Sequence, residues 1–234
     1  MSDKHLSSQF DADLNLISSK VLEMGGLVES QIITAMQALN DFDGEAAERV
    51  IVAEDRLNTM EVEIDEECSN IIARRQPAAR DLRLVLAISK TITNLERAGD
   101  EAEKIAKRTK RLMEDGASRA VNIAEIKVSG EMAVSILRRA LDAFARLDTV
   151  AAAQIVRDDK AIDEEFRAFV RKLVSYMMED PRTISVGLDY LFIAKAIERI
   201  GDHAKNIAEF IIYIVKGTDV RHKSRDALER EALS

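Results

Sequence analysis

Apolar residues recur every three or four positions along most of the chain, and polar residues fill the positions between them. This spacing is typical of long amphipathic helices that each bury one face. Clusters of polar, glycine or proline residues interrupt it near 40–44, 74–77 and 114–118, which separates three long helices in the first half. The pattern therefore predicts an all-α chain. Two prolines and 4% aromatic residues fit this class, because strand-rich domains use more turn and aromatic residues.

The second half of the chain repeats the plan of the first. Segments 95–107 and 197–209 are identical at seven of thirteen aligned positions and share the motif Glu-Arg-x-Gly-Asp. They lie 102 residues apart, earlier landmarks match at an offset of 105, and the only two prolines, Pro77 and Pro181, match at 104. A repeat of this length indicates a duplicated domain-sized unit rather than a short-period array.

The duplication predicts two tandem, pseudo-symmetric three-helix bundles, in residues 1–116 and 117–217. The chain is long enough for one large hydrophobic core or two smaller ones, and the duplication favours two. Residues 218–234 are charged and lose the apolar pattern, which predicts a loose C-terminal tail.

Each motif places a glycine in the middle of a helix, at Gly99 and at Gly201. Glycine inside a helix costs about 1 kcal/mol relative to alanine. Its presence in both copies predicts that another helix or a ligand approaches the backbone there.

Each motif also places two carboxylates one helical turn apart, Glu96 with Asp100 and Glu198 with Asp202. Like charges at this spacing repel by about 0.2–0.5 kcal/mol, and a bound cation would remove the repulsion. Oxygen ligands suit Mg²⁺, Ca²⁺, Mn²⁺ or iron, whereas zinc prefers His and Cys ligands, which the chain lacks at suitable spacing. Glu103 and Asn206 are additional candidate ligands.

The alternative interpretation is structural, with the carboxylates paired to basic side chains on their own or neighbouring helices. Flanking positions have diverged between the copies, Glu101 to His203 and Lys104 to Asn206, as expected for solvated charges. Glu, Gly and Asp nevertheless recur together. We weigh the metal and structural interpretations evenly.

The sequence gives no support for an enzyme. His203 lies beside Asp202, but no Ser or Cys nucleophile stands at a suggestive spacing, so we interpret His203 as a polar surface residue. No glycine-rich phosphate loop precedes Lys90. Cys68, the single cysteine, lies among isoleucines and is interpreted as a buried apolar residue rather than a reactive thiol.

The charge and hydropathy of the chain restrict its partners. A formal net charge of −8 disfavours nucleic acid. The longest apolar run is far shorter than the ~20 residues of a membrane span, so we expect a cytoplasmic protein that reaches the membrane only through partner proteins. Arginines flank the start of the third helix. The simplest interpretation is that they keep a solvent-exposed turn soluble, and the functional interpretation is that they bind an acidic partner. They are Arg74, Arg75, Arg80 and Arg83.

The chain resembles the PhoU family of phosphate-transport accessory proteins, which are negative regulators of the phosphate-starvation response. The resemblance is carried by the motifs at 96–100 and 198–202, by segment 76–83 at the start of the third helix, and by segment 191–195. It extends over about residues 10–216, nearly the whole chain.

The resemblance implies a homodimer of tandem three-helix bundles that binds metal ions at Glu96, Asp100, Glu198 and Asp202. It implies partnership with the phosphate ABC transporter ATPase and the phosphate sensor histidine kinase. The function implied is non-enzymatic repression of phosphate-uptake genes when phosphate is ample. Because Glu103 stands opposite Lys205, the two metal sites could differ in affinity or in ion.

A different class of function is a metal-storage protein or a metal-dependent oxidase, since helical bundles with inward carboxylates also build such sites. Those sites use a Glu-x-x-His pairing on two helices. No glutamate in this chain has a histidine three residues after it, which disfavours this alternative.

Overall fold

The described part of the chain is built almost entirely from long helices. The computed structural model describes residues 8–116 and 122–233, and no strand occurs among them, so the predicted all-α class is confirmed. The elements are α1 (Ser8–Asp41), α2 (Gly44–Arg75), α3 (Ala79–Glu114), α4 (Ala124–Arg146), α5 (Thr149–Glu179), the 3₁₀ helix η1 (Pro181–Thr183), α6 (Ile184–Lys216) and α7 (Arg225–Leu233). The predicted join between the halves, at 114–118, lies partly outside the described residues.

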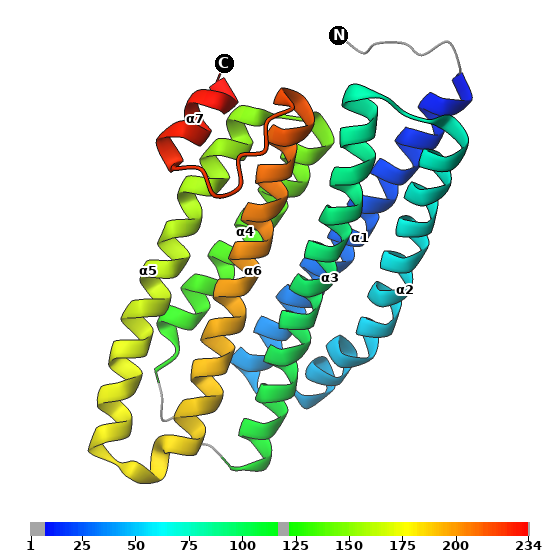
Figure 1. The fold of residues 1–234 in the computed structure, drawn as a ribbon. Coiled ribbons are helices and arrows are strands. Elements are labelled where there is room, and N and C mark those ends of the chain that lie inside the picture. The colour runs from blue at the N-terminus through cyan, green and yellow to red at the C-terminus, as the bar shows by residue number, and fades with distance from the viewer. Residues whose placement is uncertain (1–7, 117–121, 234) are drawn as a thin grey trace.

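The six long helices lie side by side and form two three-helix bundles, α1 to α3 and α4 to α6 (Figure 1). Among the described helices, α3 and α6, which carry the two motifs, pack against each other most extensively. They run in opposite directions, so an approximate two-fold rotation relates the bundles (Figure 1). The predicted pseudo-symmetric pair of bundles is therefore confirmed. No stretch within the described helices is both long and apolar enough to cross a membrane.

Matching aspartates start the middle helix of each bundle. The Asp43 side chain accepts hydrogen bonds from the backbone N–H groups of Glu45 and Ala46, both at 3.0 Å, and caps α2. Asp148, 105 residues later, caps α5 by accepting from the N–H of Ala151 at 2.9 Å. An N-cap of this kind contributes about 1 kcal/mol to stability. The repeat thus extends to the local chemistry that starts each helix.

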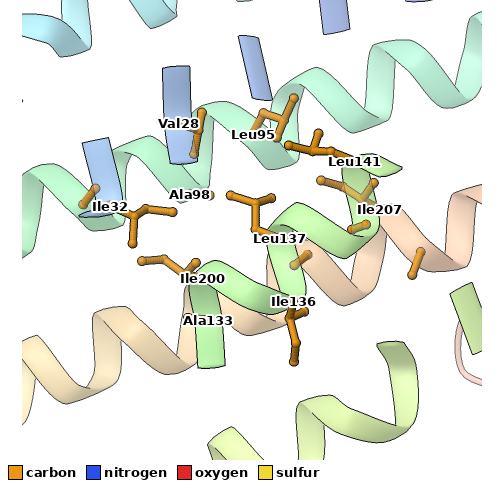
Figure 2. Packing of buried hydrophobic residues seen from close by; sticks show 14 of the residues in the cluster. Val28, Ile32, Leu95, Ala98, Ala133, Ile136, Leu137, Leu141, Ile200 and Ile207 are labelled. Atoms are coloured by element: carbon orange, nitrogen blue, oxygen red, sulfur yellow. The ribbon is translucent and has the colours of Figure 1, made fainter. Parts of the chain in front are cut away.

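The hydrophobic core of the described residues is continuous through both bundles. The expectation of two separate cores is wrong, because periodicity marks the apolar face of a helix but not the helix that covers it. Here α1 and α3 bury part of that face against α4 and α6. Cys68 is buried in the same core, as predicted, and burial raises the pKa of its thiol to about 12. The residues that meet between the bundles include Val28, Ile32, Leu95, Ala98, Leu137, Leu141, Ile200 and Ile207 (Figure 2).

Two equivalent glycines let α1 and α4 cross closely. A Cβ atom at Gly25 of α1 would overlap the end of the Leu141 side chain of α4. A Cβ atom at Gly130 of α4 would overlap the end of the Met36 side chain of α1. This reciprocal contact explains why both copies keep glycine there, and it helps to set how the bundles pack.

The C-terminal segment is folded, so the prediction of a loose tail is wrong. α7 packs against α5 beside the end of α6 (Figure 1). Val220, Leu228 and Ala232 are buried, and Thr149 Oγ1 donates a hydrogen bond to the Ala232 carbonyl at 2.8 Å. Three buried apolar residues in a short charged segment are too few to give a periodic signal, yet they are enough to dock it.

Candidate metal centre

The glycine of each motif faces the middle helix of its own bundle. A Cβ atom at Gly99 of α3 would overlap Leu57 Cδ2 and lie 3.3 Å from Glu54 Oε2, both on α2. A Cβ atom at the equivalent Gly201 of α6 would lie 3.1 Å from Asp159 Oδ1 on α5. The expected close approach is confirmed in both copies. In each case it brings a buried carboxylate beside the motif.

Three carboxylates from two helices converge at the first motif. Side-chain oxygens of Glu54, Glu96 and Asp100 lie within 4.8 Å of one another. Glu54 is only 7% exposed, and neither of its side-chain oxygens has a hydrogen-bond partner. Gln31 of α1, which is 3% exposed, also has an amide without a partner, and its Oε1 lies beside Gly99. Buried polar atoms are normally satisfied, so these residues fit a bound cation.

The charges of this cluster repel one another. Burial, together with the nearby carboxylates of Asp100, Glu103 and Glu96, raises the pKa of Glu54 to about 7. Burial and then Asp100 raise the pKa of Glu96 as well. Glu103 lies at the rim, where it pairs with Lys107 at 2.6 Å. A cluster of carboxylate and amide oxygens with excess negative charge suits a hard divalent cation.

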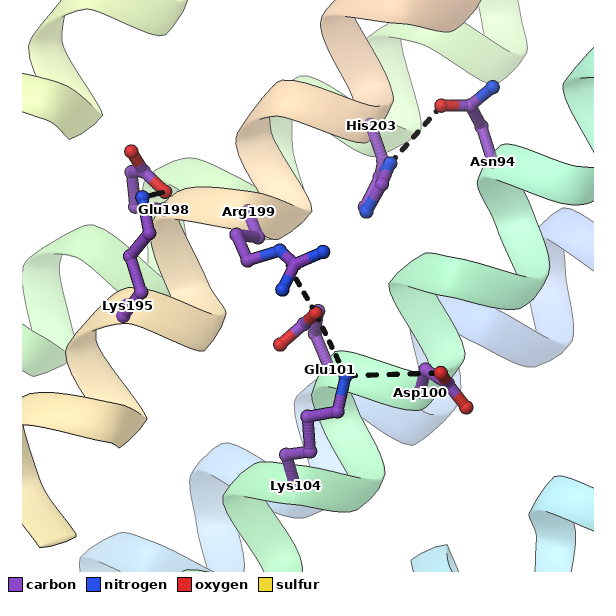
Figure 3. Close-up of polar contacts among 8 residues, drawn as sticks. All are labelled: Asn94, Asp100, Glu101, Lys104, Lys195, Glu198, Arg199 and His203. Atoms are coloured by element: carbon purple, nitrogen blue, oxygen red, sulfur yellow. Dashed lines mark hydrogen bonds and ion pairs between the residues drawn. The ribbon is translucent and has the colours of Figure 1, made fainter.

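Lysines face the carboxylates of the second motif. Lys205 Nζ lies 3.3 Å from Asp159 Oδ2 and 3.9 Å from Asp202 Oδ1. Glu198 accepts from Lys195 Nζ at 2.6 Å (Figure 3). Burial is the largest single effect and lowers the Lys205 pKa, but the carboxylates of Asp159, Asp202 and Glu209 together outweigh it and raise that pKa. The two motifs therefore share a backbone plan and differ in electrostatics.

The structure places the predicted ligands unequally. Glu96 and Asp100 meet in one cluster with Glu103 beside them, and Lys104 Nζ lies 3.8 Å from Asp100 at its outer side. Glu198 and Asp202 face Lys195 and Lys205. Asn206 lies at the contact between the bundles, where its Nδ2 donates to Asn94 Oδ1 at 3.0 Å.

Sequence reasoning missed Gln31, Glu54 and Asp159. Part of the signal was present, because Glu54 and Asp159 lie 105 residues apart and each interrupts the apolar stripe of its helix. In α2, for example, Glu54 stands between Val50 and Leu57 at helical spacing. Gln31 had no such signal, since its equivalent in the second half is an isoleucine.

A strip of polar residues crosses the contact between α3 and α6 (Figure 3). Glu101 of α3 is buried and pairs with Lys104 at 3.0 Å and with Arg199 of α6 at 3.1 Å. His203, the equivalent residue of α6, is 7% exposed, and its Nδ1 lies 3.1 Å from Asn94 Oδ1. The interpretations of His203 as a surface residue and of Glu101 as a solvated charge are wrong. The two-fold arrangement buries this pair of positions, which the pattern of a single helix cannot reveal.

Acidification should destabilise the fold through His203. Burial, and then the charges of Arg199, Arg97 and Lys104, lower the His203 pKa to about 4. The unfolded imidazole titrates near pH 6.5, so this contribution is complete above that pH and is lost as the pH falls towards 4. Relative to His203→Gln, the wild type should lose about 2 kcal/mol of stability between about pH 7.5 and about pH 5. Urea unfolding of both proteins measures this, and a pH-independent difference would contradict a buried neutral imidazole.

The four arginines of the predicted partner site are divided by their contacts. Arg75 pairs with Asp13 of α1 at 2.8 Å. Arg83 Nε donates to a backbone carbonyl near the end of α6 at 3.3 Å, so it links the bundles. Arg74 and Arg80 are exposed. Arg75 is exposed as well, but of the four only Arg74 and Arg80 are both exposed and without an ion pair in the described part of the chain.

Known proteins match the chain over nearly its whole length. The family model of the PhoU domain matches residues 21–109 and 126–211. The chain belongs to the PhoU family. The two matched segments are the two bundles, so each bundle is one PhoU domain and the sequence resemblance is confirmed.

Individual PhoU proteins agree in sequence and in structure. The phosphate-specific transport system accessory protein PhoU homolog of Burkholderia sp is 63% identical over 234 residues and covers 100% of both chains. A crystal structure of PhoU from Pseudomonas aeruginosa has a TM-score of 0.86 at 47% identity and covers 89% of this chain and 100% of that one. A crystal structure of the phosphate transport system regulatory protein PhoU from Streptococcus pneumoniae has a TM-score of 0.84 at 30% identity, covering 90% and 99%.

Proposed function

We propose that this chain is a non-enzymatic cytoplasmic regulator that joins the phosphate ABC transporter ATPase to the phosphate sensor histidine kinase. It represses the phosphate-starvation response when phosphate is ample. The observation that carries the proposal is the full-length similarity to proteins named as accessory and regulatory parts of phosphate transport. The chain acts as a homodimer and reaches the membrane only through its partners.

A regulator without catalytic chemistry acts by binding one state of its partner better than another. A tenfold preference corresponds to about 1.4 kcal/mol, which a few side-chain contacts can supply. The two pseudo-symmetric bundles present two similar elongated faces (Figure 1). This shape suits a protein that contacts two partners at once.

A divalent cation, Mg²⁺, Mn²⁺ or iron, is part of the proposal at the first motif. Glu54, Glu96 and Asp100 would hold it, with Gln31 and Glu103 beside them. The buried oxygens of Glu54 and the buried amide of Gln31, all without partners, support this assignment. A cation bound there would neutralise the carboxylates and tie α2 to α3.

Arg74 and Arg80 are the proposed contact for an acidic partner surface. Segment 104–111 of α3 is another basic run, with five basic side chains in eight residues. Its cations, however, are engaged within the chain, as in the pairs of Lys110 with Glu48 at 2.5 Å and Lys107 with a carboxylate of its own helix at 2.6 Å. Exposed arginines without such pairs steer association more effectively.

The variant Arg74→Glu with Arg80→Glu should derepress phosphate-starvation genes in phosphate-rich medium. Its stability should change by less than about 0.5 kcal/mol, because both side chains are exposed. Arg167→Glu with Arg171→Glu, an equally charged change on the exposed face of α5, is the matched control and should leave repression intact. Full repression by a normally expressed Arg74 and Arg80 variant would remove this surface from the mechanism.

Co-purification tests the proposed function itself. The tagged chain is captured from phosphate-replete cells, and enriched proteins are identified by mass spectrometry against a tag-only control. Enrichment of the transporter ATPase and the sensor kinase is the expected result. Reproducible absence of both, with the chain well expressed, would refute the linking role.

A further inference from the structure

The surroundings of the two motifs differ at several equivalent positions. The repeat offsets of 105 for the first two helices of each bundle and 102 for the motif helix define equivalent positions. At four of these positions the residue of the first motif favours cation binding more than its equivalent does. The pairs are Gln31 with Ile136, Glu61 with Phe166, Thr93 with Lys195, and Glu103 with Lys205. Three other pairs, Asn58 with Asp163, Lys104 with Asn206 and Lys107 with Glu209, differ in the opposite direction.

The change makes the second motif less acidic than the first. The first motif gathers five carboxylates from α2 and α3, namely Glu54, Glu61, Glu96, Asp100 and Glu103. The second motif keeps Asp159, Glu198 and Asp202, has the carboxylate of Asp163 near Asp159, and adds the ammonium groups of Lys195 and Lys205.

Lysines near the first motif do not pair with its innermost carboxylate, Glu54. Lys104 and Lys107 have exposed side chains and pair most closely with Glu101 and Glu103, at 3.0 Å and 2.6 Å. Glu54 forms no ion pair or hydrogen bond with either of them in the described part of the chain. The innermost carboxylate of the first motif is therefore left without a cation from the protein.

Lys205 supplies such a cation at the second motif. Its Nζ lies 3.3 Å from Asp159 and 3.9 Å from Asp202, which are the equivalents of Glu54 and Asp100. Asp159 is only 1% exposed, so its charge needs a close partner. Asp159 is also one methylene shorter than Glu54, which leaves room for the lysine. Lys195 holds the remaining carboxylate, Glu198, at 2.6 Å.

We propose that Lys205 is a built-in cation that occupies the second motif and excludes a divalent ion from it. The chain then binds such an ion at one motif only. Binding of an ion at the first motif rests on the proposed metal site, whereas its exclusion from the second motif rests on Lys205 alone. The pseudo-symmetric fold thus carries one motif that responds to metal and one whose carboxylates are paired with lysines.

Mn²⁺ binding measured by calorimetry, with elemental analysis after gel filtration, tests the exclusion. Wild type and Asp202→Asn should each bind one equivalent at the motifs, and Asp100→Asn should bind none. Adding Lys205→Glu to Asp100→Asn recreates the acidic position of the first motif and should restore one equivalent. Adding Lys160→Glu instead, an exposed lysine beside Asp159 in sequence, makes the same charge change and should restore none.

The possible results separate the exclusion by Lys205 from the proposed metal site. Two equivalents in the wild type, a loss of binding in Asp202→Asn, or no gain with Lys205→Glu would overturn the inference. No ion in the wild type together with a gain for the Lys205→Glu variant would refute the proposed metal site while leaving the role of Lys205 intact. If Lys205→Glu does not fold, Lys205→Gln in the Asp100→Asn background replaces it, and its melting temperature should rise with Mn²⁺. A melting temperature that does not change when Mn²⁺ is added would also overturn the inference.

Discussion

Replacing Arg108 with methionine should lower the free energy of unfolding by about 3–5 kcal/mol, because it leaves a buried carboxylate without its main counter-charge. Arg108 Nη1 of α3 lies 2.6 Å from Asp189 Oδ1 of α6, and the Asp189 side chain is 4% exposed. The Arg108 guanidinium also stacks on Phe192, 4.4 Å from the ring centroid. Arg111, at 4.0 Å from Asp189, is exposed and is the more distant basic neighbour. The melting temperature should fall by about 10 °C for a chain of this size.

Two further variants separate the ion pair from the packing around it. Arg111→Met removes a nearby exposed cation and should change stability by less than about 1 kcal/mol. Asp189→Asn should recover part of the loss when combined with Arg108→Met, because the unpaired buried charge is gone. Urea unfolding of the four proteins completes the comparison. Equal, mild effects of Arg108→Met and Arg111→Met would show that this pair does not hold the bundles together.

Mn²⁺ at about one hundred times its Kd should stabilise the wild type by about 2.7 kcal/mol, since it binds the folded state alone. The melting temperature should rise by roughly 5–10 °C. Glu54→Gln should abolish most of this rise. Without metal, the same variant should be more stable than the wild type, because it removes a buried carboxylate that has no partner and is surrounded by like charges. Opposite effects with and without metal identify a ligand rather than a structural residue.

Glu66→Gln makes the same chemical change at an exposed position of α2 and should alter neither melting temperature nor its response to Mn²⁺. The measurement is thermal unfolding with Mn²⁺ or with chelator. Coincident wild-type curves under the two conditions would mean that the carboxylates of the first motif are structural. Destabilisation by Glu54→Gln in chelator would point to the same conclusion.

The sequence predicts the helices and their duplication well, because both depend on local spacing. The apolar stripe of α1, the capping aspartates Asp43 and Asp148, and the repeated motif are each readable without knowing the packing partners. The shared core is not readable in this way. Gly25 and Gly130 mark the crossing of α1 and α4, but the sequence does not say that each faces the other bundle. The folding of the C-terminal segment is not predicted for a related reason, since Leu228 and Ala232 are too few to form a repeating apolar pattern.

The candidate site was predicted in part for the same physical reason. Glu96 and Asp100 share one helix, so their spacing alone places them on one face. Glu54 and Gln31 come from other helices, and only the packing at Gly99 brings them in. The burial of His203 is not predicted because it depends on contacts with α3, such as Asn94, which lies 109 residues away in sequence. Residues that act within one helix can be found from sequence, whereas those that act across a contact need the fold.

The proposed function is repression of the phosphate-starvation response. A reporter gene under a phosphate-starvation promoter measures this directly in phosphate-rich medium, in a strain lacking the chromosomal copy and in the same strain carrying the gene on a plasmid. We expect high reporter activity in the deletion strain and a return to the repressed level on complementation. A reporter that stays repressed in the deletion strain would contradict the claim.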